Sequence, residues 1–231
     1  MLAKWWVIPA TFQCMMLTAN VMASSTGPVP GLSGVPAAGN NGAENTCVMC
    51  HLDYPLNPDG LGKMTLVGVP STYVPGKIYA LELQVSHPEA NRWGFQLTAV
   101  AGKDLHGAGD FAPLAQDRTT QRVVSDVGNR VYIEHGATGK ATGVGQKNTF
   151  SWRFNWTAPS VLDGDVLFYG AFNAANGDGS NGGDKIYAPN SGLLATSRGG
   201  AAPSGTFGHL LSPPTRLPLA PAVARLDALL E

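Results

Sequence analysis

The sequence is poor in charge and in cysteine, and it has no run of basic residues. Charged side chains make up 13% of its 231 residues, about half of the roughly 25% that is usual for a soluble domain. Fifteen Lys and Arg against sixteen Asp and Glu give a net charge of -1. Because a nucleic-acid surface needs clustered basic residues to replace phosphate counterions, no nucleic-acid partner is expected.

Helical periodicity is also missing from the central part of the chain. Between residues 60 and 190, no ten-residue stretch repeats its apolar positions with a period of 3.6. Apolar residues instead alternate with polar ones in short runs, separated by turn dipeptides such as Pro75-Gly76 and Asp163-Gly164. This pattern predicts half-buried antiparallel strands and an all-β sandwich. The runs lie at 79–85, 93–99, 131–135, 150–156 and 166–170.

Glycine and proline are abundant, with 29 and 17 residues. Together they form about a fifth of the chain, below the roughly 25–30% typical of disordered sequences. The composition therefore predicts one turn-rich domain with loose arms. We expect a Gly/Pro-rich linker at 24–44, a sandwich at 63–195, and a Gly/Pro-rich tail at 196–231 that ends in a short amphipathic helix around Leu219–Leu230.

Residues 1–23 have the layout of a secretory signal peptide. Lys4 precedes an apolar stretch, and the small residues Val21 and Ala23 predict cleavage after Ala23. The stretch is short for a membrane span and contains Pro9, although an uncleaved anchor is an alternative. We expect an exported protein, periplasmic or extracellular, without a membrane span after cleavage. Cys14 would be lost with the signal peptide.

The two remaining cysteines form a single motif, Cys47-Val48-Met49-Cys50-His51. This is the C-x-x-C-H pattern of c-type haem attachment. Two thiols at this spacing each add to one haem vinyl group, and the following imidazole faces the iron. The motif predicts one covalent haem c in a segment at 45–62, with Cys47 and Cys50 as thioether anchors and His51 as the proximal ligand.

Three other roles for the cysteines remain open. A thioredoxin-like redox pair needs a βαβ context, which the polar flanking residues 39–46 do not provide. A structural zinc site needs two further soft ligands. A disulfide between Cys47 and Cys50 would close a very small loop.

The sixth ligand of the iron separates electron transfer from gas or peroxide chemistry. His135 ends a strand-like run that begins at Val131, and a strand end holds an imidazole firmly, so it is the expected distal ligand. His87, before Pro88, is the second choice, and Met64 is the best methionine. His106 and His209 lie in a glycine-rich loop and in the tail, where solvation is expected.

Several longer stretches resemble one known family. They are similar to the strands and loop of reeler-like (reelin N-terminal-type, or choice-of-anchor) domains of bacterial exported proteins, many of which carry C-x-x-C-H just before the domain. The resemblance implies an immunoglobulin-like sandwich and places a histidine at the position of His135. It is carried by RWGFQLTA at 92–99, WRFNWTAP at 152–159 and FYGAFNAANGDG at 168–179 with Gly183-Asp184.

Together these features predict an exported monohaem c-type cytochrome that transfers electrons. Redox partners and oligomeric state are not predicted. One alternative is an exported binding or structural module in which haem or a disulfide orders the N-terminal arm. Another is a haem enzyme with an open sixth position. The stretch 173–184, rich in Asn, Asp and Gly, is interpreted as a turn excursion in preference to a calcium loop.

Overall fold

The computed structural model describes residues 25–199 except 117, 139 and 191. The expected signal peptide, Cys14, His209, residues 200–231 of the expected tail and its terminal helix lie outside the described residues. The described chain contains twelve strands and two short 3-10 helices. The 3-10 helices are η1 (Cys47–Met49) and η2 (Val127–Asn129), and the strands are β1 (Lys63–Val67), β2 (Thr72–Tyr73), β3 (Ile78–His87), β4 (Arg92–Ala101), β5 (His106–Gly107), β6 (Asp110–Pro113), β7 (Thr120–Val124), β8 (Val131–His135), β9 (Asn148–Thr157), β10 (Val166–Ala175), β11 (Lys185–Tyr187) and β12 (Leu193–Gly199).

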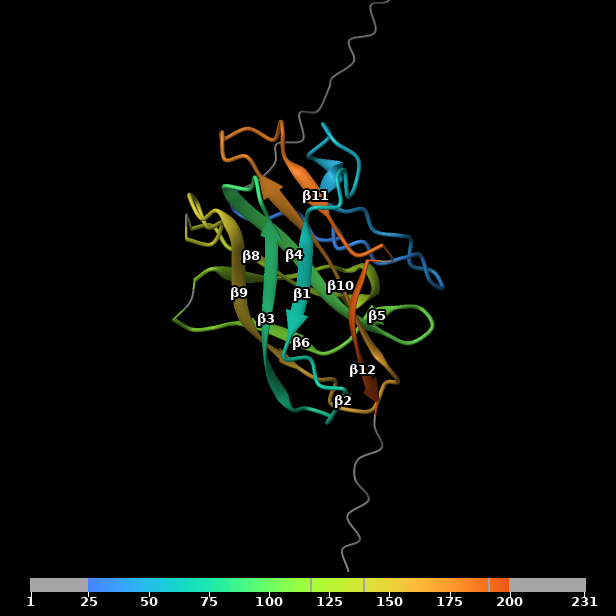
Figure 1. The fold of residues 1–231 in the computed structure, drawn as a ribbon. Helices are drawn as coiled ribbons and strands as arrows, with labels where there is room; N and C mark the ends of the chain where they lie inside the picture. Colours follow the sequence, from blue (N-terminus) through green and yellow to red (C-terminus); the bar gives the residue numbers. More distant parts are fainter. Residues whose placement is uncertain (1–24, 117, 139, 191, 200–231) are drawn as a thin grey trace, which may run out of the picture. The chain divides into compact units, whose positions relative to one another are not determined.

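The strands form two facing sheets, which confirms the predicted all-β sandwich (Figure 1). The smaller sheet has the order β1-β3-β9-β6, and the larger has the order β2-β12-β10-β4-β8-β7, with β11 paired to β10 and β5 paired to β4. All pairings are antiparallel except that of β12 with the short strand β2. No helix of the described residues is long and apolar enough to cross a membrane.

Aromatic residues fill the space between the sheets. Of the four aromatic residues in the 150–156 run, Trp152, Phe154 and Trp156 are fully buried, while Phe150 is partly buried and packs against the core. The buried rings of β9 pack with rings from the opposite sheet. The ring centroids of Phe95 and Trp152 are 4.4 Å apart, and those of Phe168 and Trp156 are 5.0 Å apart. The alternation of β9 thus places its large apolar side chains on one face, as a half-buried strand requires.

The N-terminal segment, residues 25–46, differs from the loosely attached arm that its composition suggests. Val35 is fully buried and packs on Val100 and Tyr169 at the outer face of the larger sheet. The Arg130 guanidinium, 0% exposed, donates to Glu44 Oε1 at 2.6 Å. Ser33 Oγ also donates to Glu44, at 2.6 Å. Apolar burial and a buried ion pair therefore make this segment a third layer over the larger sheet, which we call the N-terminal layer.

Further hydrogen bonds hold the start of this layer. Gln96, on β4, accepts from Leu32 N–H at 2.6 Å and donates to Val29 O at 2.9 Å. Gln121 donates to Thr26 O at 2.7 Å. Polar side chains on the outer face of the sheet thus bind the backbone of a segment that has no strand partner along most of its length, which satisfies groups that burial would otherwise leave unpaired.

Candidate functional site

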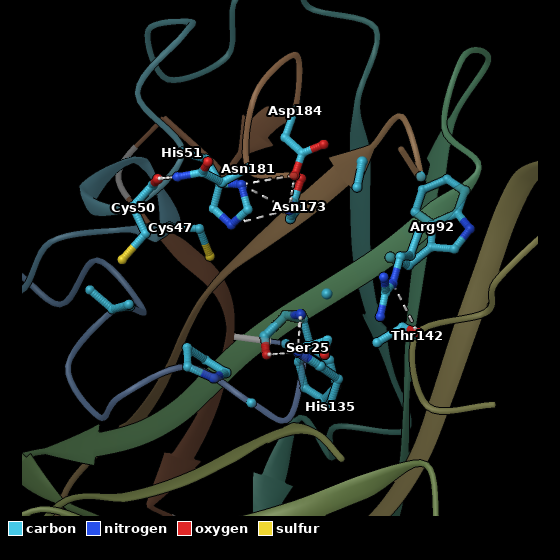
Figure 2. Close-up of a pocket in the computed structure, with 18 of the residues that line it drawn as sticks. Ser25, Cys47, Cys50, His51, Arg92, His135, Thr142, Asn173, Asn181 and Asp184 are labelled. Atoms are coloured by element: carbon cyan, nitrogen blue, oxygen red, sulfur yellow. Dashed lines mark hydrogen bonds and ion pairs between the residues drawn. The ribbon is translucent and has the colours of Figure 1, made fainter. Parts of the chain in front are cut away.

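A cavity of about 650 Å³ lies between the larger sheet and the covering segments. Its walls come from the start of the N-terminal layer, from η1 and the residues that follow it, from the first residues of β4, and from the loop between β10 and β11 (Figure 2). Four of the five predicted site residues line it, namely Cys47, Cys50, His51 and His135. More than 80 residues of sequence separate the C-x-x-C-H motif from His135, so the fold alone brings them together.

The 3-10 helix η1 sets the positions of the two thiols. Cys50 N–H and His51 N–H both donate to Cys47 O at 3.2 Å, so the chain turns tightly across the motif. Cys47 is buried against Ala171 and Ile186 of the larger sheet, while Cys50 is half-buried. Asn181 fixes this turn by donating to Cys50 O at 2.8 Å.

Both cysteines are free thiols. Burial raises the pKa of Cys47 to about 12 and also raises the pKa of Cys50. A redox-active C-x-x-C pair needs a thiolate, and hence a lowered pKa. The surroundings of Cys47 and Cys50 therefore disfavour the thioredoxin-like alternative.

His51 is held by a carboxylate from the β10–β11 loop. Its Nδ1 lies 2.8 Å from Asp184 Oδ2, and Asp184 is 2% exposed. Asn173 Nδ2 donates to the same carboxylate oxygen at 3.0 Å and lies 3.4 Å from each ring nitrogen of His51. Figure 2 shows this group on one side of the cavity.

His135 lies on the other side of the cavity in the same view (Figure 2). It ends β8 and is buried. Its Nδ1 lies 3.2 Å from Phe95 N and 3.3 Å from Phe95 O. A Cβ atom on Gly94 would stand 3.1 Å from the ring of His135, tighter than most such contacts, so glycine at this position leaves room for the imidazole.

Arg92 is the one residue with a fixed positive charge among the described residues that line the cavity. Its Nε donates to Thr142 Oγ1 at 3.3 Å, and within the described chain no carboxylate forms an ion pair with it. Apolar side chains, including Val29, Leu32 and Phe95, form other parts of the wall. The cavity therefore combines an apolar lining with one cation and two imidazoles.

The second-choice ligand His87 does not line this cavity. It is 1% exposed, lies 5.3 Å from the ring of Tyr187, and its Nε2 is 3.5 Å from Asp59 Oδ2. Met64 lies on β1 and packs against the inner core, also away from the cavity. The structure thus groups His135, and not His87 or Met64, with the C-x-x-C-H motif.

His106 is not simply solvated. Its ring bridges Asp104 and Asp163, at 2.7 Å from each carboxylate. The carboxylates of the 173–184 stretch also have separate partners, since Asp178 accepts from Ser180 while Asp184 binds His51. No group of three or more metal-binding side chains is found in the described part of the chain.

Sequence reasoning missed Asp184, Asn173 and Arg92 as site residues. The sequence identifies Asp184 only as one acidic residue in a turn-forming stretch, and it identifies Arg92 only as the first residue of a strand. Neither position carries a local motif, because both side chains gain their role from a partner far along the chain. The resemblance to one family did, however, draw attention to the strand and the loop that contain them.

Comparison with protein-family models and with curated proteins finds no match. Solved structures that are similar to the chain include the Reelin-N domain of F-spondin, with 21% identity, 61% of this chain and 87% of that chain covered, and a TM-score of 0.41. The reeler domain of human F-spondin shows 19% identity, coverage of 61% and 89%, and a TM-score of 0.39. A type II cohesin module from the ScaA scaffoldin of Acetivibrio cellulolyticus shows 9% identity, coverage of 63% and 94%, and a TM-score of 0.35.

Reeler domains are thus among the structures to which this chain is similar. The assignment of the fold rests on the two sheets described above, and no functional residue is taken from these structures.

Proposed function

We propose that the chain is an exported monohaem c-type cytochrome whose function is electron transfer. The observation that carries the proposal is the shared cavity, which Cys47, Cys50, His51 and His135 line together. Ligand pockets typically enclose about 300–1,000 Å³, and this one, at about 650 Å³, lies in the middle of that range. Export is proposed with it, because haem c is attached outside the cytoplasm.

The donor set fits haem c. Cys47 and Cys50 would form the two thioether bonds, His51 would be the proximal ligand, and His135 the distal one. Arg92 is suited to pair with a haem propionate, since it is a cation in the cavity wall without a carboxylate partner in the described chain. When bound, the haem iron supplies a one-electron redox centre.

The tautomer of His51 suits it to bind a metal. His51 donates Nδ1–H to Asp184, which leaves Nε2 as the nitrogen with an available lone pair. At His135, Nδ1 accepts from Phe95 N–H at 3.2 Å and also lies 3.3 Å from Phe95 O, so these two contacts do not select one tautomer. No methionine is among the described lining residues. Ligation by two histidines gives a lower reduction potential than ligation by His and Met, because a thioether ligand raises it.

The remaining alternatives make different demands on the structure. If the haem only ordered the N-terminal arm, that arm would need an external staple. Residues 25–46 are instead fixed by their own contacts, notably Glu44 with Arg130 and Val35 with Val100. An enzyme with an open sixth position would need His135 to stay off the iron.

Haem attachment is tested by expressing the full chain with a c-type maturation system. We expect a haem-stained band and a pyridine haemochrome spectrum with one haem per chain, both lost in the double variant Cys47→Ser/Cys50→Ser. A mature N-terminus at Ser24 would support export. A wild-type chain that matures beside a positive-control cytochrome yet carries no haem would overturn the proposal.

The sixth ligand is tested with a matched pair of buried histidines. His135→Ala should convert a low-spin spectrum to a high-spin one and allow carbon monoxide to bind the reduced protein. His87→Ala should remain low-spin, because His87 lies outside the cavity. The reverse result would assign the ligand to His87, and carbon monoxide binding by the wild type would favour the open-site enzyme.

A further inference from the structure

We propose that Asp184, held by Asn173, is the positioning residue that fixes the tautomer and orientation of His51 and lowers the reduction potential of the haem. This inference rests on the proposed function for its redox part. The His51–Asp184 contact itself is a property of the chain.

The first support is the burial of a carboxylate at the imidazole. Asp184 is 2% exposed, and its Oδ2 lies 2.8 Å from His51 Nδ1. A buried carboxylate is costly unless its charge is matched by donors. Asp184 has three: His51, Asn173 through Nδ2 at 3.0 Å, and Asn176 through its backbone N–H at 3.1 Å. It is therefore fixed in one orientation before any ligand enters.

The second support is that the carboxylate selects the tautomer of His51. Asp184 is an acceptor, so it requires a proton on His51 Nδ1, 2.8 Å away. Asn173 Nδ2 lies 3.4 Å from both ring nitrogens and so favours neither, but its hydrogen bond to Asp184 Oδ2 holds the acceptor in place. His51 Nε2 is thereby the nitrogen that would bind a metal.

The third support is the way the fold places the pair. Asn173 lies on β10, directly opposite Ile186 of β11, and Asp184 immediately precedes β11. The two strands and the loop between them thus bring both side chains to His51. Histidine ligands of metals commonly donate their second N–H to a carboxylate, which orients the ring and makes it a stronger donor.

The charge of Asp184 has a predictable effect on the iron. It is the one carboxylate among the described residues that line the cavity. A negative charge beside the proximal ligand stabilises the oxidised, more positive haem and so lowers the reduction potential. Removing the charge while keeping the shape of the side chain should raise the potential.

The test compares Asp184→Asn with Asp178→Asn in the haem-loaded full chain. Asp178 lies in the same loop and is exposed, so its variant removes an equal charge away from His51. For Asp184→Asn we expect unchanged haem attachment and about a tenfold shift of the oxidised–reduced equilibrium toward the reduced form. That shift corresponds to about 59 mV for a one-electron couple. Asp184→Glu, which keeps the charge, should restore most of the wild-type potential.

A shift no larger than that of Asp178→Asn would overturn the role in tuning. Nitrogen-15 NMR of His51 in the wild-type full chain tests the contact with or without haem and without any variant. A proton on Nδ1 is expected, and a proton on Nε2 would overturn the positioning role. If the wild type carries no haem while Nδ1 is protonated, the proposed function fails and the His51–Asp184 contact stands.

Discussion

Strands β3 and β9 of the smaller sheet alternate between buried and more exposed residues, whereas β4 and β10 of the larger sheet are buried along almost their whole length. The difference follows from what covers each sheet. The smaller sheet has one face toward the core, so period-two alternation appears directly. The larger sheet has the core on one face and the N-terminal layer on the other.

The two buried faces of the larger sheet also differ in chemistry. The inner face carries rings such as Phe95 and Phe172. The outer face carries buried polar groups, including Gln96, Glu134 and Asn173. Burial raises the pKa of Glu134 to about 7, against the lowering effect of hydrogen bonds from Gln121 and Gln96. The inner face therefore stabilises the fold through apolar packing, while the outer face fixes a polar segment and the cavity.

The largest effect is expected at the ion pair that joins the N-terminal layer to the sheet. Glu44→Gln leaves the Arg130 guanidinium buried without its counter-charge, because Glu44 Oε1 lies 2.6 Å from Arg130 Nη1. Breaking one partner of a buried pair costs about 3–5 kcal/mol. We expect a loss of this size in the free energy of unfolding measured with urea.

The control for this pair lies on the outer surface of the smaller sheet. Arg153, 68% exposed, is 3.4 Å from Glu82, and exposed pairs contribute about 0–1 kcal/mol. Arg153→Gln should therefore change the free energy of unfolding by less than about 1 kcal/mol. Equal losses in Glu44→Gln and Arg153→Gln would show that the N-terminal layer is not an integral part of the fold.

A pair of valines separates the two buried faces without touching charge. Val35 is 0% exposed in the N-terminal layer, and Val85 is 3% exposed in the inner core. Val35→Ala and Val85→Ala should each lower the free energy of unfolding by about 1.5–3 kcal/mol, since both lose two methyl groups and leave a cavity. A full loss in Val85→Ala with none in Val35→Ala would mean that the layer detaches before the sandwich unfolds.

The sandwich was predictable because its signal is local. The alternation of β3 and β9 and the turns such as Pro75-Gly76 identify strands within a few residues of sequence. In β4 the alternation of Trp93, Phe95 and Leu97 predicts a half-buried strand whose intervening polar positions face solvent. Gln96 is in fact 0% exposed, because it binds a segment more than 60 residues earlier.

The candidate site was predictable only where a motif carries it. The five-residue C-x-x-C-H pattern identifies Cys47, Cys50 and His51, and His135 is favoured because it ends a strand. Asp184 and Arg92 have no such signal. The glycines and prolines of the N-terminal layer predict a loose linker, yet the buried partners of Glu44 and Val35 hold it on the sheet.

The smallest effect is expected where an electrostatic contact is half-exposed, at His106 between Asp104 and Asp163. The hydrogen bond with Asp104, which has the largest effect, and the hydrogen bond with Asp163 raise the pKa of His106 above its ordinary value near 6.5. The folded state therefore binds a proton more tightly than the unfolded chain. This contribution is complete below about pH 6.5 and is lost as the pH rises through the folded pKa.

The quantity to measure is the difference between wild type and His106→Gln, because it isolates the contribution of His106. Urea midpoints at pH 5.5 and 8.5 should show a loss of stability at high pH that is smaller in the variant. Identical slopes in the two proteins would show that solvent screens this bridge, in contrast to the buried pair of Glu44 and Arg130.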